Sequence, residues 1–224
     1  MQNINPDLFY PFIKVLLEVN KDINLISREV KPEEVFAKHI YDSVKITDFF
    51  DFSNVKTLLD IGSGGGLPGI PLAIALPHVQ VTLLDSTEKK MRAAQKIADD
   101  MKLKNVTVIS GRTEELGHNQ TLRGNFDIVT ARAVAELPVI LEYALPFVKI
   151  GGYFVAYKGK NYQAELSESK KAMDTLSAKL ANIYTYELPD NLGERVYIVY
   201  KKISGTPKNY PRNIGVPKKT PLKS

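Results

Sequence analysis

Five glycines fall within eight residues, between Gly62 and Gly69, and they separate two apolar stretches. Residues 57–59 before them are typical of a buried strand, and the residues from Pro68 onward are typical of a helix with proline in its first turn. Glycine lets the backbone turn tightly and approach a ligand, and the following helix start offers unpaired N–H groups and a positive dipole end. The stretch from Asp60 to Gly69 therefore predicts a strand–turn–helix site for a nucleotide-like cofactor.

Short apolar runs alternate with helical patterns along the rest of the chain. Strands are predicted over residues 81–85, 106–110, 126–130 and 152–157, and helices over residues 88–101, 137–148 and 163–182. This alternation is typical of a parallel, doubly wound α/β sheet with right-handed crossovers. Two later extended runs, 184–188 and 195–203, are joined by a short turn without a helix, which predicts an antiparallel hairpin. The expected fold is a seven-stranded, mostly parallel, Rossmann-like sheet that ends in this hairpin.

The first 50 residues are predicted to form a helical extension packed on the sheet. Asn5-Pro6-Asp7 combines an N-cap, a first-turn proline and an acid that suits the helix dipole, and apolar residues follow at helical spacing up to Val19. A second helix is expected to begin near Pro32. We therefore divide the chain into an N-terminal helical extension (residues 1–50), a Rossmann-like domain (51–203) and a C-terminal tail (204–224).

Composition excludes several kinds of site. The chain has no cysteine, which rules out disulfides, a cysteine nucleophile and thiolate metal sites. Its three histidines, His39, His78 and His118, are too scattered to suggest a metal centre. No apolar run reaches the roughly 18 residues of a membrane span, and the N-terminus lacks a basic region followed by an apolar one. We expect a cytoplasmic monomer without a membrane anchor or a bound metal.

The tail carries an uneven share of the charge. The chain has 30 Lys and Arg residues against 25 Asp and Glu, and residues 201–224 hold seven of the basic residues and none of the acidic ones. The rest of the chain is therefore close to neutral. A basic tail without an amphipathic period favours nucleic acid over membrane as the partner, and a tail that only improves solubility is the alternative.

Two cofactors fit the glycine-rich stretch. Gly64 to Gly69 matches the Gly-x-Gly-x-x-Gly of dinucleotide sites, and Asp85 follows about 20 residues later, where a ribose-binding acid is expected. Asp60 argues against a dinucleotide, because a carboxylate at the strand end would repel a pyrophosphate. The same carboxylate can help to organise a site around the ammonium group of S-adenosylmethionine. The terminal hairpin also favours a methyltransferase sheet over a dehydrogenase sheet.

A dehydrogenase would also need a proton-transfer group. Tyr197 and Lys201 have Tyr-x-x-x-Lys spacing, but on a strand their side chains would lie roughly 13 Å apart. Tyr41 and Lys45 have the same spacing on a helix, but they precede the cofactor stretch. We therefore predict a Rossmann-like class I S-adenosylmethionine-dependent methyltransferase, with a nicotinamide-dependent oxidoreductase as the alternative.

Residues after the second and third predicted strands are candidate cofactor contacts. Asp85 can accept both ribose hydroxyls as a bidentate carboxylate, and the alternative reading is a turn residue at the strand end. Thr113 and Glu114 follow the third strand, where an adenine edge usually lies. Thr-Glu-Glu is equally typical of an ordinary helix start, so both readings stay open there.

The segment after the fourth predicted strand limits which kind of atom can accept the methyl group. Enzymes that methylate an amino group of adenine or glutamine carry an Asn/Asp-Pro-Pro-aromatic motif there, whereas residues 130–135 read Thr-Ala-Arg-Ala-Val-Ala. A nucleophile with its own lone pair and no proton to lose, such as guanine N7, needs no such acceptor, and catalysis is then mostly alignment. Arg132 is the residue expected to hold O6, a phosphate or the cofactor carboxylate. A strand-end arginine paired with Glu136 is the alternative.

Basic residues near the predicted cofactor mouth form a candidate RNA groove. Lys89, Arg112 and Lys158 belong to this set, and Lys89 shares a helix face with Arg92 and Lys96. A solvated helix face is an equal alternative, because residues 88 and 92, and residues 96 and 100, are oppositely charged i,i+4 pairs.

Longer parts of the sequence match a known pattern. The specific matches are the run Leu-Pro-Gly-Ile-Pro-Leu at 67–72 and the tail segments Tyr210-Pro211-Arg212 and Pro217-Lys218-Lys219. Weaker matches lie at residues 24–25, 39–43, 60–66, 73, 85–86, 111–115, 131–133 and 158–159. Together they cover nearly the whole chain and resemble the bacterial 16S ribosomal RNA guanine-N7 methyltransferases, also called glucose-inhibited division protein B. Lys90 departs from the pattern, because an arginine is more usual there.

The resemblance implies methyl transfer from S-adenosyl-L-methionine to guanine N7 in 16S ribosomal RNA, free or in the small ribosomal subunit, with Arg132 as catalytic residue. The predicted cofactor-binding residues are Asp60, Gly62, Gly64, Leu67, Asp85, Ser86, Thr87, Thr113, Glu114 and Arg132. The predicted RNA-binding residues are Lys89, Arg112, Lys158, Lys208, Arg212, Lys218 and Lys219. A non-catalytic RNA-binding protein on the same fold is the second hypothesis.

Overall fold

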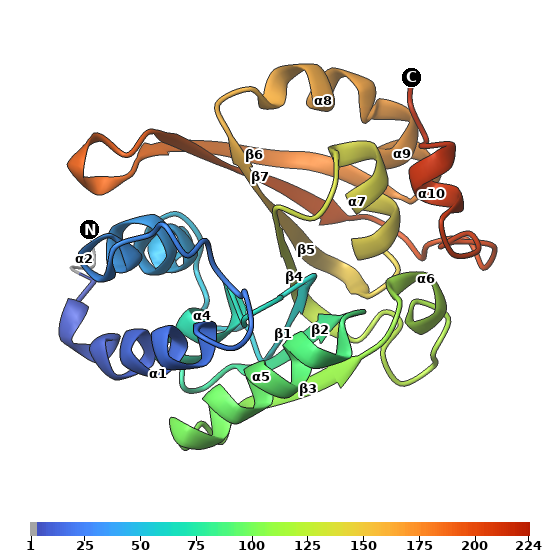
Figure 1. The fold of residues 1–224 in the computed structure, drawn as a ribbon. Coiled ribbons are helices and arrows are strands. Elements are labelled where there is room, and N and C mark those ends of the chain that lie inside the picture. The colour runs from blue at the N-terminus through green and yellow to red at the C-terminus, as the bar shows by residue number, and fades with distance from the viewer. Residues whose placement is uncertain (1–3) are drawn as a thin grey trace.

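The computed structural model describes residues 4–224, which contain one seven-stranded sheet with helices on both faces (Figure 1). The strands are β1 Thr57–Ile61, β2 Gln80–Asp85, β3 Val106–Ser110, β4 Phe126–Arg132, β5 Val148–Gly159, β6 Ala178–Glu187 and β7 Glu194–Lys202. They lie in the order β3-β2-β1-β4-β5-β7-β6. The first five are parallel to one another, and β7 runs antiparallel between β5 and β6. The predicted Rossmann-like sheet and its terminal hairpin are confirmed.

Helices cover the two faces of the sheet. The N-terminal part contains η1 Pro6–Leu8, α1 Tyr10–Asn20, α2 Pro32–Val35, the π-helical η2 Phe36–Tyr41, α3 Asp42–Val44 and η3 Lys45–Asp48. The later helices are α4 Gly69–Ala75, α5 Glu88–Asp100, α6 Thr113–Leu116, α7 Leu137–Ala144, α8 Tyr162–Glu168, α9 Lys170–Thr175, η4 Pro189–Asn191 and α10 Val216–Lys219. The N-terminal helices, α4 and α5 contribute to the core on one face, and α7 and α9 contribute to the core on the other.

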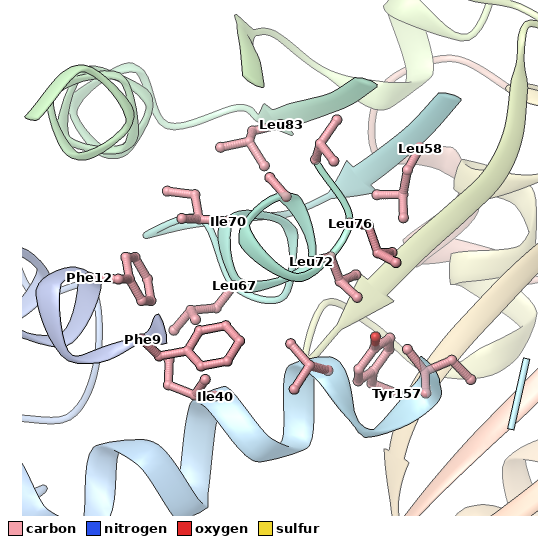
Figure 2. Packing of buried hydrophobic residues seen from close by; sticks show 14 of the residues in the cluster. Phe9, Phe12, Ile40, Leu58, Leu67, Ile70, Leu72, Leu76, Leu83 and Tyr157 are labelled. Atoms are coloured by element: carbon pink, nitrogen blue, oxygen red, sulfur yellow. The ribbon is translucent and has the colours of Figure 1, made fainter. Parts of the chain in front are cut away.

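The N-terminal helices share a hydrophobic core with the sheet. Phe9 and Phe12 are at most 1% exposed and belong to the same cluster as Leu58 of β1. Figure 2 shows both phenylalanines beside α4, with Ile40 of η2 on the next helix. Burying apolar area of this kind stabilises the fold by roughly 25 cal/mol per Å². Residues 1–3 of the predicted extension lie outside the described residues, and the segment boundaries at 50 and 203 stay predictions.

Two predicted helices are shorter than the sequence pattern indicates. The helix predicted over 137–148 ends at Ala144, and β5 already begins at Val148. The long polar helix predicted over 163–182 is wrong in its second half: α9 ends at Thr175, and β6 begins at Ala178 after Ser177 takes a left-handed conformation (φ 61°). The physical reason is tertiary, because β6 pairs with β7 from Ala178 to Glu187 with one irregularity between Leu180 and Asn182, and this ladder outweighs local helix propensity.

The basic tail folds back onto the α6–α7 side of the sheet. Arg123 donates four hydrogen bonds to backbone carbonyls, three of them in the tail at Thr206, Pro207 and Tyr210. The Arg212 side chain forms an ion pair with the fully buried Glu142 of α7, at 2.6 Å between Nη2 and Oε2. The tail is therefore fixed to the domain through buried polar contacts.

Candidate active site

The carboxyl ends of β1, β2, β3 and β4 surround a cavity of about 250 Å³. Asp85, Ser86, Arg112, Thr113 and Glu114, all predicted to serve the cofactor or the RNA, line it. Gly62 lines it as well. Its other lining residues are Ile61, Leu84, Lys90, Gly111, Ala133, Val134 and Tyr143. We call this space the cofactor cavity.

Asp85 is held at the cofactor cavity by the two loops around it. Its Oδ2 accepts a hydrogen bond from the backbone N–H of Gly64 at 3.1 Å, and its Oδ1 accepts one from the N–H of Thr87 at 2.8 Å. Asp85 ends β2, and the chain turns there into α5, whose N-cap is Thr87. The carboxylate is thus oriented by backbone donors, with lone pairs remaining on both oxygens.

Asp60 lies behind the cavity and does not line it. The side chain is fully buried in β1, where Oδ2 accepts the Gly69 N–H at 2.9 Å and Oδ1 accepts the Thr130 hydroxyl at 3.0 Å. Burial raises the pKa of this carboxyl to about 7. Asp60 therefore joins the strand to the start of α4 and to β4, which organises the glycine-rich loop from behind.

Position 62 requires glycine because its backbone is left-handed and because Val134 leaves no room for a Cβ. Gly62 has a positive φ of 66°, and a Cβ there would lie 2.5 Å from Cγ2 of Val134. Its N–H donates to the carbonyl of Leu84 at 2.7 Å, so the loop stays attached to β2. The loop therefore reaches the cavity as backbone, as the glycine pattern predicts.

Leu67 and Thr87 are two predicted cofactor contacts that the structure does not bring to the cavity lining. Leu67 is buried in the core beside α4. Gly64 is also absent from the lining, although its N–H contacts Asp85. Val134 and Tyr143 line the cavity and were not predicted. Val134 is an apolar residue that is 37% exposed, whereas Tyr143 lies within α7, where its sequence position gives no functional signal.

Glu114 connects the cofactor cavity to the tail. Its Oε1 accepts the Gly215 N–H at 3.1 Å, and its Oε2 accepts the Thr113 hydroxyl at 3.3 Å. Burial, followed by the charge of Glu114, raises the pKa of the neighbouring Tyr143 to about 12. Both Thr113 and Glu114 belong to α6, so the reading as a helix start is confirmed, and their contact with an adenine edge stays a prediction.

A second cavity, of about 380 Å³, lies beside the first. It is lined by Lys38, His39, Asp42, Arg132, Ala133, Tyr157, Lys158, Gly159 and Arg195. Ala133 lines both cavities and has a left-handed backbone conformation, with φ of 55°. We call this second space the acceptor cavity. The N-terminal helices supply part of its wall through Lys38, His39 and Asp42.

Arg132 ends β4 inside the acceptor cavity and is paired with an unexpected acid. Its Nη1 donates to Oδ2 of Asp42 at 2.8 Å and to the His39 carbonyl at 3.4 Å. The alternative reading of Arg132 anticipates an ion pair, but with Glu136. The Arg132 side chain is 16% exposed.

His39 contributes a neutral ring to the acceptor cavity. Burial, followed by the charge of Arg132, lowers the pKa of the imidazole to about 4. Among residues 4–224, its Nε2 has no hydrogen-bond partner. The ring therefore carries no charge at neutral pH and is a weak base.

The predicted RNA contacts fall into two groups. Lys158 donates to Glu165 at 2.6 Å and to the Ala135 carbonyl at 2.8 Å, and Arg212 is paired with Glu142 as described above. Both side chains therefore have structural partners. The other five, exposed at the surface, are Lys89, Arg112, Lys208, Lys218 and Lys219.

The helix that carries Lys89 also contains the expected i,i+4 ion pairs. Glu88 pairs with Arg92 at 3.3 Å and Lys96 with Asp100 at 2.7 Å, all with well exposed side chains. Surface pairs of this kind contribute little to stability. Lys89 takes part in neither pair, and within the part of the chain that the structure describes it has no acidic partner.

Two kinds of feature are absent from residues 4–224. No cluster of three or more His, Asp or Glu side chains in this range is arranged to hold a metal ion. No helix in the same range has both the length and the apolar character needed to span a bilayer.

Solved structures with this fold include proteins described as methyltransferases. A SAM-dependent methyltransferase from Aquifex aeolicus aligns with a TM-score of 0.57 and 13% identity, covering 83% of this chain and 97% of that one. TrmN from Thermus thermophilus aligns with a TM-score of 0.54 and 18% identity, covering 73% and 48%. The fold is therefore that of class I S-adenosylmethionine-dependent methyltransferases, and the nicotinamide-oxidoreductase alternative is not supported.

Sequence comparisons give the family. The family model GidB, described as rRNA small subunit methyltransferase G, matches residues 6–192. Proteins named ribosomal RNA small subunit methyltransferase G from Brevibacillus brevis and Bacillus subtilis are 43% and 42% identical over 214 residues, covering 96% of this chain and 90% and 89% of theirs. The chain therefore belongs to the GidB family of small-subunit rRNA methyltransferases.

Proposed function

We propose that this protein transfers a methyl group from S-adenosyl-L-methionine to N7 of a guanine in 16S ribosomal RNA. The observation that carries the proposal is the pair of cavities that meet at Ala133. One contains the carboxylate and loop backbone that suit a nucleoside cofactor, and the other contains Arg132 and opens beside it. Two reactants held in adjacent cavities gain from proximity and orientation, which contribute most to a transfer without proton movement.

The cofactor cavity suits the parts of S-adenosylmethionine. Asp85 is assigned to the ribose hydroxyls, since its carboxylate is oriented and keeps free lone pairs. Thr113 and Glu114 are assigned to the adenine edge, and Gly62 and Gly64 to close backbone approach. Asp60 acts from behind the loop through Gly69 and Thr130. Among the other predicted contacts, Ser86 lines the mouth, while Leu67 and Thr87 support its walls.

The reaction makes few demands on acid or base groups. When bound, S-adenosylmethionine would supply an electrophilic methyl group, so that the N7 lone pair would form the new bond as the carbon–sulfur bond breaks and sulfur keeps that electron pair. N7 carries no proton to remove, so the acceptor cavity needs no general base. His39 is consistent with this, because its pKa of about 4 makes the ring a weak base. The protein's task is alignment of the base with the cofactor cavity.

Arg132 is assigned to hold the acceptor base or an adjacent phosphate. An arginine beside N7 would oppose the positive charge that the product gains, so O6 or a phosphate oxygen is the better partner. Lys38 and Arg195 line the same cavity and add positive charge. Exposed Lys89, Arg112 and the tail lysines are assigned to phosphates farther along the RNA, as a basic surface around the mouth of the site.

A methylation assay with 16S RNA and with small subunits, using radiolabelled S-adenosylmethionine, tests the proposal. Arg132→Ala is expected to reduce kcat/KM at least 100-fold, whereas Arg28→Ala, an exposed arginine outside both cavities, should leave it unchanged. Chemical cleavage at N7-methylguanine locates the product. Full activity of Arg132→Ala, or product at a position other than guanine N7, would contradict the proposal.

Binding of the cofactor is tested separately by calorimetry. Asp85→Ala is expected to weaken S-adenosylmethionine binding at least tenfold, because the oriented carboxylate is lost. Asp99→Ala, on an exposed part of α5, is the matched control. Equal affinities for the two variants would remove Asp85 from the cofactor site.

A further inference from the structure

Asp42 is a buried acid whose two carboxylate oxygens both have partners. It lies in α3 and is 4% exposed. Oδ2 accepts Nη1 of Arg132 at 2.8 Å, and Oδ1 accepts the Tyr186 hydroxyl at 2.7 Å. An acid from the N-terminal part thus directly contacts the arginine that the proposed function places at the acceptor base, although 90 residues separate them in the sequence.

Three strands hold the α3 segment in place through tyrosine hydroxyls. Tyr197 of β7 donates to the Asp42 carbonyl at 2.7 Å, and Tyr157 of β5 donates to the Ser43 carbonyl at 2.9 Å. The rings of Tyr186 and Tyr197 stack with centroids 4.7 Å apart, and those of Tyr157 and Tyr197 pack edge to face at 4.8 Å. Burial raises the pKa of all three phenols well above the ordinary value, so they remain neutral donors. The carboxylate is therefore attached to a rigid support.

The two hydrogen bonds that Arg132 donates leave other N–H groups of its guanidinium free to bind an acceptor. Both hydrogen bonds use Nη1, and within residues 4–224 neither Nε nor Nη2 has a partner. A guanidinium has five donors in a planar fork, so fixing one nitrogen sets the direction of the others. Because Arg132 lines the acceptor cavity, its remaining donors are those that a base or phosphate would meet.

The charges around Asp42 distinguish positioning from simple neutralisation. Arg195 approaches Oδ1 only to 3.9 Å, and Lys38 lines the cavity without an ion pair to Asp42. Of the three cations Arg132, Arg195 and Lys38, it is Arg132 that forms a short hydrogen bond to the Asp42 carboxylate. An acid that served only to reduce positive charge would need no such fixed geometry or support.

We propose that Asp42 is a positioning residue for methyl transfer: supported by Tyr157, Tyr186 and Tyr197, it holds the Arg132 guanidinium in the orientation that contacts the acceptor. The inference rests on the proposed function of Arg132. It assigns the N-terminal helices a part in catalysis, since the residue that orients Arg132 lies in α3 and not in the sheet.

Asp42→Asn tests the inference with little change in side-chain volume. The amide keeps one acceptor for either Arg132 or Tyr186 but loses the charge that holds the guanidinium. We expect kcat to fall about 10- to 100-fold, as small misplacements and lost orienting contacts typically cause. The Kd of S-adenosylmethionine and the KM of the RNA should change less than about threefold. Each kcat is expressed per cofactor site counted by calorimetry, so that unfolded protein does not enter the value.

A double-mutant cycle with Arg132→Gln separates positioning from a general structural effect. If Asp42 acts through Arg132, the second substitution should leave kcat of Arg132→Gln unchanged within about twofold. Asp48→Asn is the matched control, because Asp48 is a similarly buried acid of the N-terminal part that pairs with Lys45 at 2.7 Å, outside both cavities. We expect that control to lower the melting temperature without lowering kcat.

The outcomes distinguish this inference from the proposed function. Full activity of Arg132→Gln would contradict the role of Arg132 itself. An inactive Arg132→Gln together with an Asp42→Asn variant of normal kcat would overturn the positioning role alone. Additive losses of kcat in the double variant would also overturn it, because the two residues would then act independently.

Discussion

At the scale of single residues, Asp60 shows how a site can depend on a group that does not touch its ligand. The sequence pattern indicates a cofactor-organising acid at the end of the first strand. In the structure the carboxylate bonds to Gly69 and Thr130, so it fixes the helix start and the neighbouring strand. The buried Asp60 side chain therefore helps to set the geometry of the glycine-rich loop and of β4 at the cavity.

The buried acid predicts a pH dependence of stability. The pKa of Asp60 is about 7 in the folded protein, against 3.8 ordinarily, so between these values the folded state binds more protons than the unfolded chain. This carboxyl's contribution to stability is therefore fully present below about pH 3.8 and is lost as the pH rises to about 7. Asp60→Asn should flatten the pH dependence of the urea midpoint between pH 5 and pH 7.5, whereas the exposed control Asp190→Asn should not. Identical slopes for all three proteins would contradict the assignment.

Gly69 makes a second residue-scale prediction. A Cβ at this position would overlap the buried Leu83 side chain and lie 3.0 Å from Oδ2 of Asp60. Its backbone is helical, so strain at φ is not involved. Gly69→Ala should reduce the free energy of unfolding by about 1–3 kcal/mol, the usual cost of overpacking. Gly205→Ala, where no atom lies within 4 Å of the new Cβ, should change it by less than about 0.5 kcal/mol in the same denaturation measurement.

At the scale of elements, the tail differs from a solvated basic segment. Its residues pack on α6 and α7, and His118 contacts the Pro211 carbonyl at 2.7 Å. Charge counting identifies a basic tail but not this packing, because Glu142 lies 70 residues away from Arg212. The sequence predicts the hairpin of β6 and β7, but not that β6 begins as early as Ala178. Residues 178–182 have a helical pattern and become a strand only because a partner strand exists.

The ion pair between tail and α7 gives an element-scale prediction. Arg212→Met removes the partner of Glu142, which is fully buried, and should cost roughly 3–5 kcal/mol, as expected for breaking a buried pair. The exposed Lys218→Met, also in the tail, is the control and should change stability by less than about 0.5 kcal/mol. Thermal unfolding of both variants checks this. A stable Arg212→Met protein would return Arg212 to the set of candidate RNA contacts.

At the scale of the whole molecule, the sheet and the cofactor loop follow from sequence, and the acceptor cavity does not. Alternating strands and helices, the glycines and Asp85 act over short distances, so local patterns identify them. The contact of Arg132 with Asp42 joins segments that only the complete sheet brings together. No spacing rule distinguishes Asp42 from Glu136 as the partner of Arg132, because that choice depends on tertiary packing.

Electrostatic binding of RNA is also a property of the whole surface. Lys208, Lys218 and Lys219 are exposed on the folded tail, so replacing all three by glutamine should leave stability unchanged. The slope of log affinity against log salt for 16S RNA should become shallower by about 2 to 3, if each lysine neutralises one phosphate. An unchanged slope would show that the tail does not contact the RNA backbone. Replacing the lysines is preferable to deleting the tail, since deletion would also uncover Glu142.

The tyrosine support of Asp42 has a consequence for the order in which the protein becomes active during synthesis. Tyr186 and Tyr197 follow Asp42 by 144 and 155 residues, whereas the loop from β1 to β2 is complete long before. A nascent chain therefore contains the glycine-rich loop and Asp85 well before β6 and β7 emerge from the ribosome and fix α3. Until those strands pair, Arg132 has no oriented partner, so a chain arrested before β7 would lack the acceptor cavity.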